Sequence, residues 1–345
     1  MKQQTNGKQV VKPPKTWATP DHHLQALLSH EWYKCILKLF SQTLLATHSF
    51  YAERNIYPCV FPVTTGSVSS PMGIGSDSIP IKINMHGHEI FLADSMQFAL
   101  ELGTRLNHTG MYYVMPSFRG EDVDQRHLNE FIHSEVEIPG TLEDILTLGE
   151  SYLISLAKHL SSTCATEIQA TAGSIEHVVK LAALPGRFHR LKYEDALQEI
   201  KGIKDAVRNV KSEWSVITPL GERALVNKFG DFVWLTHMPW LNVPFYQAKE
   251  AGTNSSLTGD LLAGIGEILG CGQRINDVDD LLESYKFHHV DRQTYAWYTQ
   301  MRQLAPLQTA GFGLGIERFL MWVTQTDDIR DCCLIYRDHS QVIYP

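Results

Sequence analysis

Apolar residues near the start of the chain recur at helical spacing. Within residues 24–40 they lie three or four positions apart, the period of one helix face. Thr19 suits the N-cap of such a helix, and Pro20 suits its first position. The pattern predicts one long amphipathic helix, whose apolar stripe consists of Leu24, Leu27, Leu28, Trp32, Ile36, Leu39 and Phe40.

Residues 131–138 alternate with the period of a strand instead. One face carries an aromatic ring and ionisable groups, from Phe131, His133, Glu135 and Glu137. The other face is mostly apolar and should pack on helices, with Ile132, Ser134, Val136 and Ile138. Residues 111–118 read as the preceding strand. If the two strands pair as a hairpin through the loop 121–128, Arg119 lies beside the polar face.

The remaining periodic segments predict a mixture of helices and strands in one domain, residues 19–345, because no linker divides the chain. Residues 1–18 are polar without periodicity and are predicted to be a disordered tail. Strands or hairpins are predicted at 56–66, 81–95 and 231–239. Helices are predicted at 96–106, 141–164, 193–207, 276–303 and 316–323.

Composition narrows the class of protein. With 345 residues, 43% hydrophobic and 20% charged, the chain is long enough for a substantial core. No apolar run approaches the roughly 18 residues of a membrane span. A net charge of −8 argues against a protein that coats nucleic acid. The cysteines form no CxxC pair, which favours buried thiols in a reducing cytoplasm: Cys35, Cys59, Cys164, Cys271, Cys332 and Cys333.

The hairpin around Arg119 is the first candidate site. Arginine presents a rigid fork that matches phosphate oxygens, and the Phe131 ring can stack on a base. Carboxylates on the same strand face suit a charged ligand. A solvated hairpin with surface ion pairs is the alternative that composition leaves open.

Two glycine-rich segments add further candidates. Asp260 and Glu267 lie within 259–275, and two carboxylates near closely approaching backbone suit magnesium, which also takes phosphate oxygens. A glycine-rich hairpin with surface acids is the alternative. In the segment 311–323, Arg318 falls in the first turn of the predicted helix, where an anion is favoured. The spacing is not that of a dinucleotide-binding GxGxxG motif.

Together these segments resemble the signature motifs of class II aminoacyl-tRNA synthetases, and most closely the aspartyl/asparaginyl subgroup. "FRGEDVDQRHLNEF" is similar to motif 2, and "GFGLGIERFLMWVTQTDDIRD" is similar to motif 3. "ADSMQFALE" and "GEILGCGQR" resemble segments that contribute the amino-acid pocket and metal ligands. The resemblance covers roughly residues 25–337 in order. It implies an α+β fold with an antiparallel sheet flanked by helices.

The resemblance also implies an ATP-dependent ligase that forms an aminoacyl-adenylate. Arg119 would hold the α-phosphate and Arg318 the γ-phosphate, with Glu267 completing the catalytic set. His127 would lie near the β- and γ-phosphates, and Phe131 would stack on adenine with Arg318 on the other side. The implied ATP-binding residues are Arg119, Glu121, His127, Phe131, Asp260, Glu267, Gly315 and Arg318. Mg²⁺ would be bound by Asp260 and Glu267.

The amino-acid pocket implied by the resemblance contains Ser95, Gln97, Glu135 and Arg274. Ser95 and Gln97 would hold the α-amino end, and Arg274 would meet the side-chain oxygen. Aspartate-binding members usually have lysine at the position of Leu100 and aspartate at that of Glu135. A glutamate can accept from an amide but repels a carboxylate, so asparagine is favoured and aspartate remains the alternative.

The acceptor of the acyl group is less defined. About two dozen polar residues precede the first predicted core helix, so an anticodon-binding module is not expected. The segment "NVPFYQ" also lacks the lysine usual in the subgroup. These departures favour an amine-type acceptor other than tRNA. Asparagine synthesis from ammonia, tRNA charging and a non-catalytic regulatory role are the alternatives. The resemblance implies a cytoplasmic homodimer that joins through the first helix and the strand after it.

Overall fold

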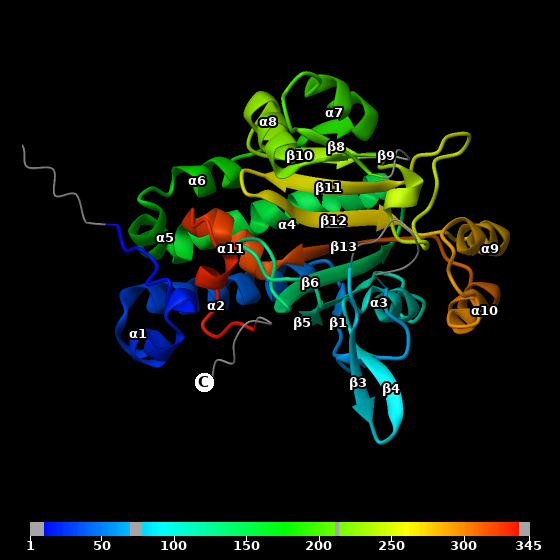
Figure 1. Cartoon of the computed structure of the whole chain (residues 1–345), viewed down its shortest axis with the longest axis horizontal. Coiled ribbons are helices and arrows are strands. Elements are labelled where there is room, and N and C mark those ends of the chain that lie inside the picture. Colours follow the sequence, from blue (N-terminus) through cyan, green and yellow to red (C-terminus); the bar gives the residue numbers. More distant parts are fainter. Residues whose placement is uncertain (1–9, 70–77, 211–213, 338–345) are drawn as a thin grey trace, which may run out of the picture.

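Within residues 10–69, 78–210 and 214–337, which this computed structural model describes, eight strands form one central sheet (Figure 1). Neighbouring strands are antiparallel, except at the two edges, where β1 with β5 and β10 with β7 are parallel. Across the sheet, the order is β1 (Tyr57–Pro58), β5 (Met111–Phe118), β6 (Glu130–Pro139), β13 (Thr309–Gly315), β12 (Gly266–Gln273), β11 (Thr258–Ala263), β10 (Val233–Thr236) and β7 (His189–Lys192).

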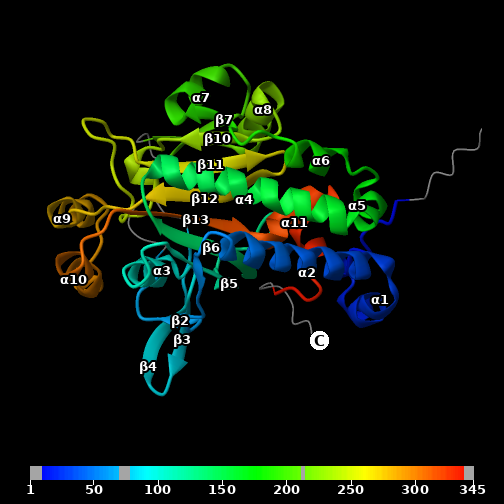
Figure 2. The same cartoon turned by 180° about the vertical axis from the view of Figure 1, so that it is seen from behind.

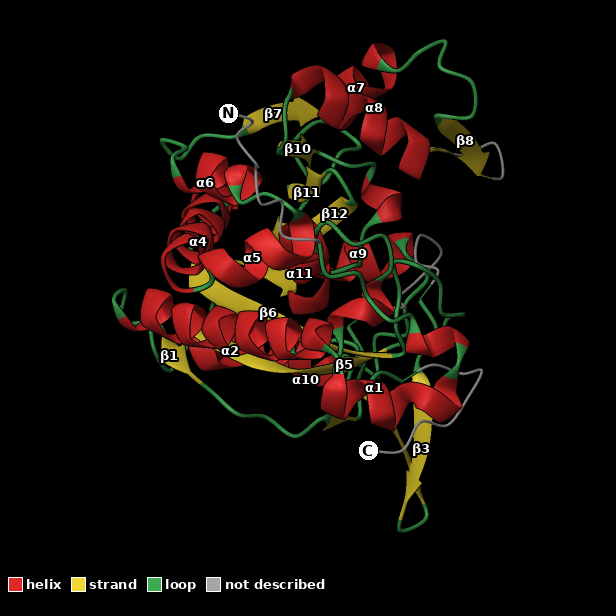
Figure 3. Cartoon of the chain, turned by 90° about the vertical axis from the view of Figure 1, so that its left-hand side faces the viewer, coloured by secondary structure: helices red, strands yellow, loops and turns green. Residues whose placement is uncertain are grey.

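Two small sheets accompany the central one. The first projects from it as a hairpin (Figure 3) and contains β2 (Thr64–Thr65), β4 (His88–Leu92) and β3 (Ile81–Met85). The second pairs β8 (Val207–Val210) with β9 (Trp214–Ile217). The predicted hairpins of 81–95 and of 111–138 are therefore confirmed, as is the mixed α+β architecture with an antiparallel central sheet.

Two long helices cover one face of the central sheet, and part of the opposite face packs on α7 (Tyr193–Glu199) and α8 (Pro219–Phe229) in a second hydrophobic cluster. Figure 2 shows α2 (Glu31–Ala52) and α4 (Leu142–Thr163) lying across the covered face. Tyr152 of α4 donates to Ser134 Oγ of β6 at 2.9 Å, so the predicted apolar face of β6 does meet a helix. The chain reaches α4 through Thr141, whose capping box with Asp144 satisfies N–H groups of the first turn.

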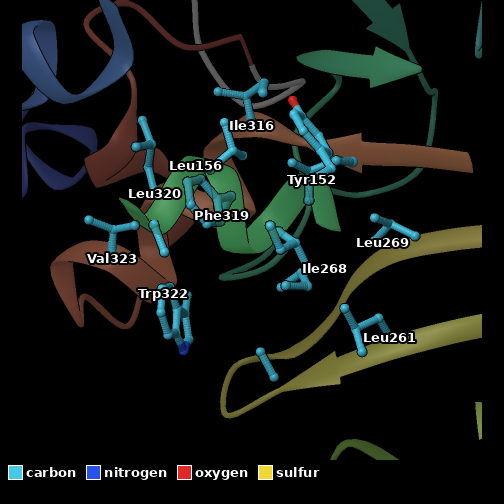
Figure 4. Close-up of a cluster of buried hydrophobic side chains, with 14 of the residues drawn as sticks. Tyr152, Leu156, Leu261, Ile268, Leu269, Ile316, Phe319, Leu320, Trp322 and Val323 are labelled. Atoms are coloured by element: carbon cyan, nitrogen blue, oxygen red, sulfur yellow. The ribbon is translucent and has the colours of Figure 1, made fainter. Parts of the chain in front are cut away.

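The principal core lies between α4, the sheet and the last helix, α11 (Ile316–Thr324). Figure 4 shows Leu156 of α4 close to Phe319 and Leu320 of α11, beside Ile268 of β12. Because all of these side chains are at most 2% exposed, this packing fixes the start of α11 against the strands. The remaining helices are α1 (His23–Ser29), α3 (Gln97–Thr104), α5 (Ala165–Ala172), α6 (Glu176–Ala182), α9 (Val278–Phe287) and α10 (Ala296–Leu304).

Three predicted helices differ from the structure. The first is divided at His30, which has extended backbone and accepts the N–H of Trp32 on Nδ1 at 3.2 Å. The helix predicted at 193–207 ends at Glu199, and positive φ at Gly202 and Asp205 turns the chain into β8. The helix predicted at 276–303 is two helices, α9 and α10, which the sequence periodicity merges into one.

Part of the segment expected to be a disordered tail takes part in the fold instead. Residues 10–18 contact the rest of the domain, and residues 1–9 lie outside the described part, so the expectation for them stays a prediction. Thr16 is buried and shares hydrogen bonds with His23 Nδ1 at 2.8 Å and the Tyr33 hydroxyl at 2.7 Å. Trp17 donates to Asp331 Oδ1 at 3.0 Å. These long-range partners cannot be recognised from local composition.

The described helices include none with the length and apolar character needed to cross a membrane.

Candidate active site

Two adjoining cavities lie on the face of the sheet opposite to α4, where Phe131, His133 and Glu135 of β6 point. The first has a volume of about 400 Å³ and the second about 270 Å³. Arg119, His133, Glu267 and Gly313 line both, so the two cavities are neighbours. The first cavity also receives Glu121, His127, Phe131, Gly315 and Arg318. The second also receives Ser95, Gln97, Glu135, Asp260 and Arg274. The structure thus brings together every predicted site residue.

Arg119 and Phe131 face each other across the β5–β6 hairpin. In the strand register, Phe131 is opposite Ser117, and Ser117 precedes Arg119 by two residues. The guanidinium carbon of Arg119 lies 5.6 Å from the Phe131 ring centroid. The side chain of Asn129 fixes the loop start by donating to the backbone oxygens of Arg119 at 2.8 Å and Glu121 at 2.7 Å.

Four polar atoms at this hairpin are buried without a hydrogen-bond partner among the described residues. They are Nε of Arg119, Oε2 of Glu121, Nε of Arg126 and Oδ1 of Asn129. Because an unpaired buried polar atom is costly, such atoms indicate a place where a ligand supplies the missing partners. A solvated hairpin with surface ion pairs, the alternative reading, does not account for them.

Arg318 approaches the same cavity from the first turn of α11. Its Nη1 donates to the Glu267 backbone oxygen at 2.9 Å, and its Nε donates to the Arg126 backbone oxygen at 3.2 Å. Burial lowers the pKa of Arg318, and the cations Arg126 and Arg119 lower it further, against the opposing effect of Glu267. Three guanidinium groups gathered in one cavity are suited to a polyphosphate.

His127 lies in the loop between the strands, and its Nδ1 is 2.8 Å from Asp124 Oδ1. Burial lowers the pKa of His127, and the nearby charge of Arg318 adds to that effect. The neutral imidazole is therefore favoured near pH 7. Because its one N–H, at Nδ1, is donated to Asp124, Nε2 can only accept a hydrogen bond, and it would donate to a phosphate oxygen only if the ring were protonated.

Asp260 and Glu267 converge from β11 and β12. A side chain at Gly270, between them, would place its Cβ 3.0 Å from Glu267 Oε1 and 3.5 Å from Asp260 Oδ1. Burial raises the pKa of Asp260 well above its usual value, and the charge of Glu267 raises it further. Glu267 Oε2 lies 3.9 Å from Arg318 Nη1. Two carboxylates that converge beside a phosphate-sized cavity fit Mg²⁺, which completes its shell with water and phosphate oxygens. The described residues contain no group of three or more metal-ligating side chains.

The polar groups of the second cavity are largely paired with one another. Ser95 Oγ donates to Glu135 Oε2 at 2.7 Å, and the Tyr113 hydroxyl donates to the same oxygen. His133 Nδ1 lies 3.1 Å from Glu135 Oε1. Burial tends to raise the pKa of Glu135, but these partners outweigh burial and hold it below the usual value. Glu135 is thus ionised and already holds three protein donors.

Arg274 is paired in the same way. It is 3% exposed and makes a two-pronged ion pair with Glu137, through Nε to Oε1 at 3.1 Å and Nη2 to Oε2 at 2.9 Å. Its Nη1 donates to Gln247 Oε1 at 2.9 Å. Gln97 Nε2 bonds to Val136 O at 2.9 Å. The side chain of Arg274 is therefore fixed in orientation, which suits recognition of a small polar substrate.

Leu100 is placed differently from what the resemblance implies. It is fully buried in a cluster with Tyr113 and Met115, and it does not line the second cavity. The next residue, Glu101, bonds to Arg302 Nη2 at 2.7 Å in the interior. Leu100 therefore affects the substrate pocket through Tyr113, whose hydroxyl reaches Glu135.

Sequence reasoning missed several residues that line the cavities. Arg126 was within the recognised motif and His133 was on the predicted polar strand face, but neither received a role, although Arg126 is a further cation beside the predicted ones. Tyr246 and Gln247 line the second cavity from a loop with no periodic pattern. Only the missing lysine of "NVPFYQ", the segment that ends with these two residues, drew attention to that loop. The position of the loop depends on pairing with Arg274, which directly follows β12 and lies more than 20 residues away along the chain.

Comparisons with known proteins agree with this geometry. The family described as "tRNA synthetases class II (D, K and N)" matches residues 21–338. A probable cytoplasmic asparagine–tRNA ligase of Schizosaccharomyces pombe is 30% identical over 279 residues, which are 74% of this chain and 45% of that protein. Its counterpart in Encephalitozoon cuniculi is 29% identical over 314 residues, covering 88% and 67%. The chain thus spans less than half of the S. pombe relative.

Solved structures show the same fold. Asparaginyl-tRNA synthetase from Pyrococcus horikoshii complexed with asparaginyl-adenylate has a TM-score of 0.86 at 24% identity, covering 96% of this chain and 74% of the other. The Entamoeba histolytica asparaginyl-tRNA synthetase, also complexed with asparaginyl-adenylate, has a TM-score of 0.80 at 25% identity, covering 94% and 71%.

Proposed function

Because the chain belongs to the class II tRNA synthetases of the D, K and N group, we propose that it is an ATP-dependent, AMP-forming ligase that activates asparagine. One observation carries this proposal. Arg119, Phe131 and Arg318 line one cavity, which adjoins a second cavity containing Ser95, Glu135 and Arg274. A nucleotide and a small amino acid would lie side by side in them.

The chemistry follows from that juxtaposition. A carboxylate oxygen of the amino acid attacks the α-phosphorus of ATP and forms a new P–O bond. The bond from the α-phosphorus to the bridging oxygen breaks, and pyrophosphate leaves. Negative charge builds on the phosphate oxygens, so Arg119 and Arg318, positioned beforehand, stabilise the transition state. No side chain has to accept a proton in this step.

Phe131 and Glu121 would orient the adenine ring, and His127 and Gly315 would border the phosphates. Asp260 and Glu267 would hold Mg²⁺, which would neutralise part of the phosphate charge when bound. Their placement at the boundary of the two cavities, with Glu267 lining both, supports this assignment.

Asparagine is favoured over aspartate by the charge of the second cavity. Ionised Glu135 lies within it, and Glu137 neutralises Arg274. A second carboxylate on the substrate would meet uncompensated repulsion, whereas an amide can both donate and accept. The relatives named as asparagine–tRNA ligases agree with that choice.

For the acceptor, the comparisons favour tRNA over the non-tRNA amine expected from the sequence. The matched relatives are named as tRNA ligases. We therefore propose the terminal adenosine of tRNA as the acceptor. Both relatives are also named as cytoplasmic, which supports the same compartment for this chain.

Pyrophosphate exchange into ATP tests the activation step, with asparagine and aspartate measured side by side. We expect exchange with asparagine at least tenfold above that with aspartate. Arg119→Ala and Arg318→Ala should each reduce it by a hundredfold or more, because each removes a preorganised charge worth about 3 kcal/mol. Exposed Arg187 offers a matched control, since Arg187→Ala should exchange normally. Exchange that survives both cavity substitutions would contradict the proposed site.

The acceptor is tested in a second stage with the same preparation. Labelled asparagine should become attached to tRNA. Label transferred to ammonia or another amine, with none on tRNA, would restore the acceptor expected from the sequence. Equal exchange with aspartate would overturn the asparagine assignment while leaving the ligase chemistry in place.

A further inference from the structure

Helix α8 brings one carboxylate to Arg126, a residue that lines the nucleotide cavity, from a part of the chain that contains none of the predicted motifs. Glu222 occupies its first turn, and Thr218 accepts the N–H of Gly221 at 3.4 Å as the N-cap. Leu225 and Val226 bury the inner face of the helix in a hydrophobic cluster. The position of Glu222 is therefore set by rigid packing.

Glu222 pairs with Arg126 of the loop between β5 and β6. Arg126 Nη2 lies 3.2 Å from Glu222 Oε2, and the two side chains are 23% and 17% exposed. Both pack on the β11–β12 turn at Gly266, where an added Cβ would lie 2.6 Å from Arg126 Cζ and 2.8 Å from Glu222 Oε2. A glycine with φ of +108° at this point leaves room for the pair.

The pairing restrains only one edge of the Arg126 guanidinium. Its Nε is buried without a hydrogen-bond partner among the residues that the structure describes. Arg126 also lines the first cavity together with Arg119 and Arg318. Mutual repulsion among three cations would drive Arg126 outward in the absence of a counterion, and Glu222 offsets that repulsion.

The backbone of the loop between β5 and β6 is also held in place at Arg126. Arg318 Nε donates to the Arg126 backbone oxygen at 3.2 Å, and the Arg126 N–H donates to Asp124 Oδ1 at 2.6 Å. With the side chain anchored on Glu222, Arg126 is constrained at both its main chain and its guanidinium. Holding a long side chain in one orientation beforehand lowers the entropic cost of binding.

We propose that Glu222 is a positioning residue, which holds Arg126 at the wall of the nucleotide cavity with its guanidinium directed at the phosphate chain of ATP. This inference rests on the proposed function, because it takes ATP as the ligand of the first cavity. It assigns a role to a helix that supplies none of the residues predicted to touch either substrate.

The test compares the full-length protein with its Glu222→Gln variant, which keeps size and hydrogen-bonding capacity but removes the charge. ATP binding is measured by calorimetry without amino acid, and pyrophosphate exchange is measured with asparagine. We expect the Kd and KM for ATP to rise about tenfold, whereas the KM for asparagine stays unchanged. Arg223→Gln, at an exposed neighbouring position on α8, should behave as the unaltered protein.

A double substitution separates positioning from general destabilisation. Arg126→Gln should also weaken ATP binding, and the Glu222→Gln/Arg126→Gln protein should be no weaker than Arg126→Gln alone, because Glu222 acts through Arg126. Circular dichroism and urea unfolding establish that the variants are folded at the assay temperature.

Several outcomes would overturn the proposal. Removing a negative charge near the phosphates could tighten ATP binding, so an unchanged or lower Kd for Glu222→Gln contradicts positioning. Additive effects of the two substitutions contradict it as well. A raised Mg²⁺ requirement with unchanged ATP affinity would make Glu222 a metal ligand instead. If the unaltered protein binds ATP but does not exchange, the proposed function fails while binding still tests Glu222.

Discussion

Glu317 shows how burial changes the chemistry of a single residue. It precedes Arg318 in the first turn of α11, and its two carboxylate oxygens accept the N–H of Ile132 at 3.1 and 3.0 Å. Burial raises the pKa of Glu317 to about 7. The side chain is 4% exposed and has no cationic partner among the described residues, so ionisation near neutral pH is costly.

This shift predicts how stability depends on pH. Between the ordinary glutamate pKa and about 7, the folded chain binds a proton that the unfolded chain has lost. Proton binding by Glu317 contributes fully to the free energy of unfolding at acid pH, and this contribution is lost as the pH rises to 7. The free energy of unfolding then falls by at most about 1.4 kcal/mol per pH unit. Glu317→Gln cannot ionise and can still accept a hydrogen bond.

Urea unfolding of the unaltered chain and of Glu317→Gln at pH 5, 6, 7 and 8 tests this pH dependence of stability. The unaltered chain should lose more stability than Glu317→Gln across that range. Parallel curves would contradict the assignment of a protonated Glu317. The comparison between the two proteins cancels the contribution of Asp331, whose pKa burial raises to about 6.

At the scale of elements, α2 exposes apolar side chains at a hollow that it shares with β6 and the C-terminal segment of the described chain. Leu37 is 56% exposed and lines a cavity of about 490 Å³ with Phe40 and Leu44. The same cavity receives Ile132 and Leu334. An apolar hollow along a long helix is typical of a surface that another chain covers. The homodimer expected from the sequence would place its partner here.

Light scattering during gel filtration tests this interface. We expect a dimer for the unaltered chain and a shift toward monomer for Leu37→Glu, because a buried unpaired charge is costly in an interface. Leu304→Glu is the matched control, since Leu304 is 77% exposed on α10. A monomeric unaltered chain, or a Leu37→Glu dimer of equal stability, would argue against this surface.

The observed helices and strands also show which sequence signals were sufficient to predict secondary structure. The 111–138 hairpin was predictable because two alternating strands flank a short polar loop, and α4 because a cap precedes an apolar period. The break at His30 was not, since the apolar stripe continues through it. The division between α9 and α10 depends on tertiary packing around Tyr285 and Tyr298, which local periodicity does not encode.

For the whole molecule, the sequence was sufficient to predict residues that the structure brings together at two cavities, but not their pairing. Arg119 and Arg318 lie within short recognisable motifs, and both line the first cavity. The partners that fix the second cavity come from distant segments, such as Glu137 and Gln247 for Arg274. No spacing rule connects residues so far apart, so these ion pairs and the anchoring of Arg126 by Glu222 required coordinates.

Contacts between residues far apart in the sequence also join the two ends of the described chain. Trp17 stacks under Arg330, with the guanidinium carbon 3.8 Å from a ring centroid, and bonds to Asp331. The segment that follows Asp328 in turn reaches the nucleotide cavity, where Ile329 donates its N–H to Gln125 O at 2.9 Å. The loop that carries Arg126 and His127 is thus supported by both ends of the domain.

Retention of the reaction product tests the central claim most directly. The protein is mixed with ATP, Mg²⁺ and asparagine, passed through a desalting column and denatured, and the released small molecules are identified by mass spectrometry. The account predicts asparaginyl-adenylate in an amount approaching one per chain, with none from Arg119→Ala or Arg318→Ala. Bound ATP with no adenylate, or adenylate formed equally well by both variants, would contradict it.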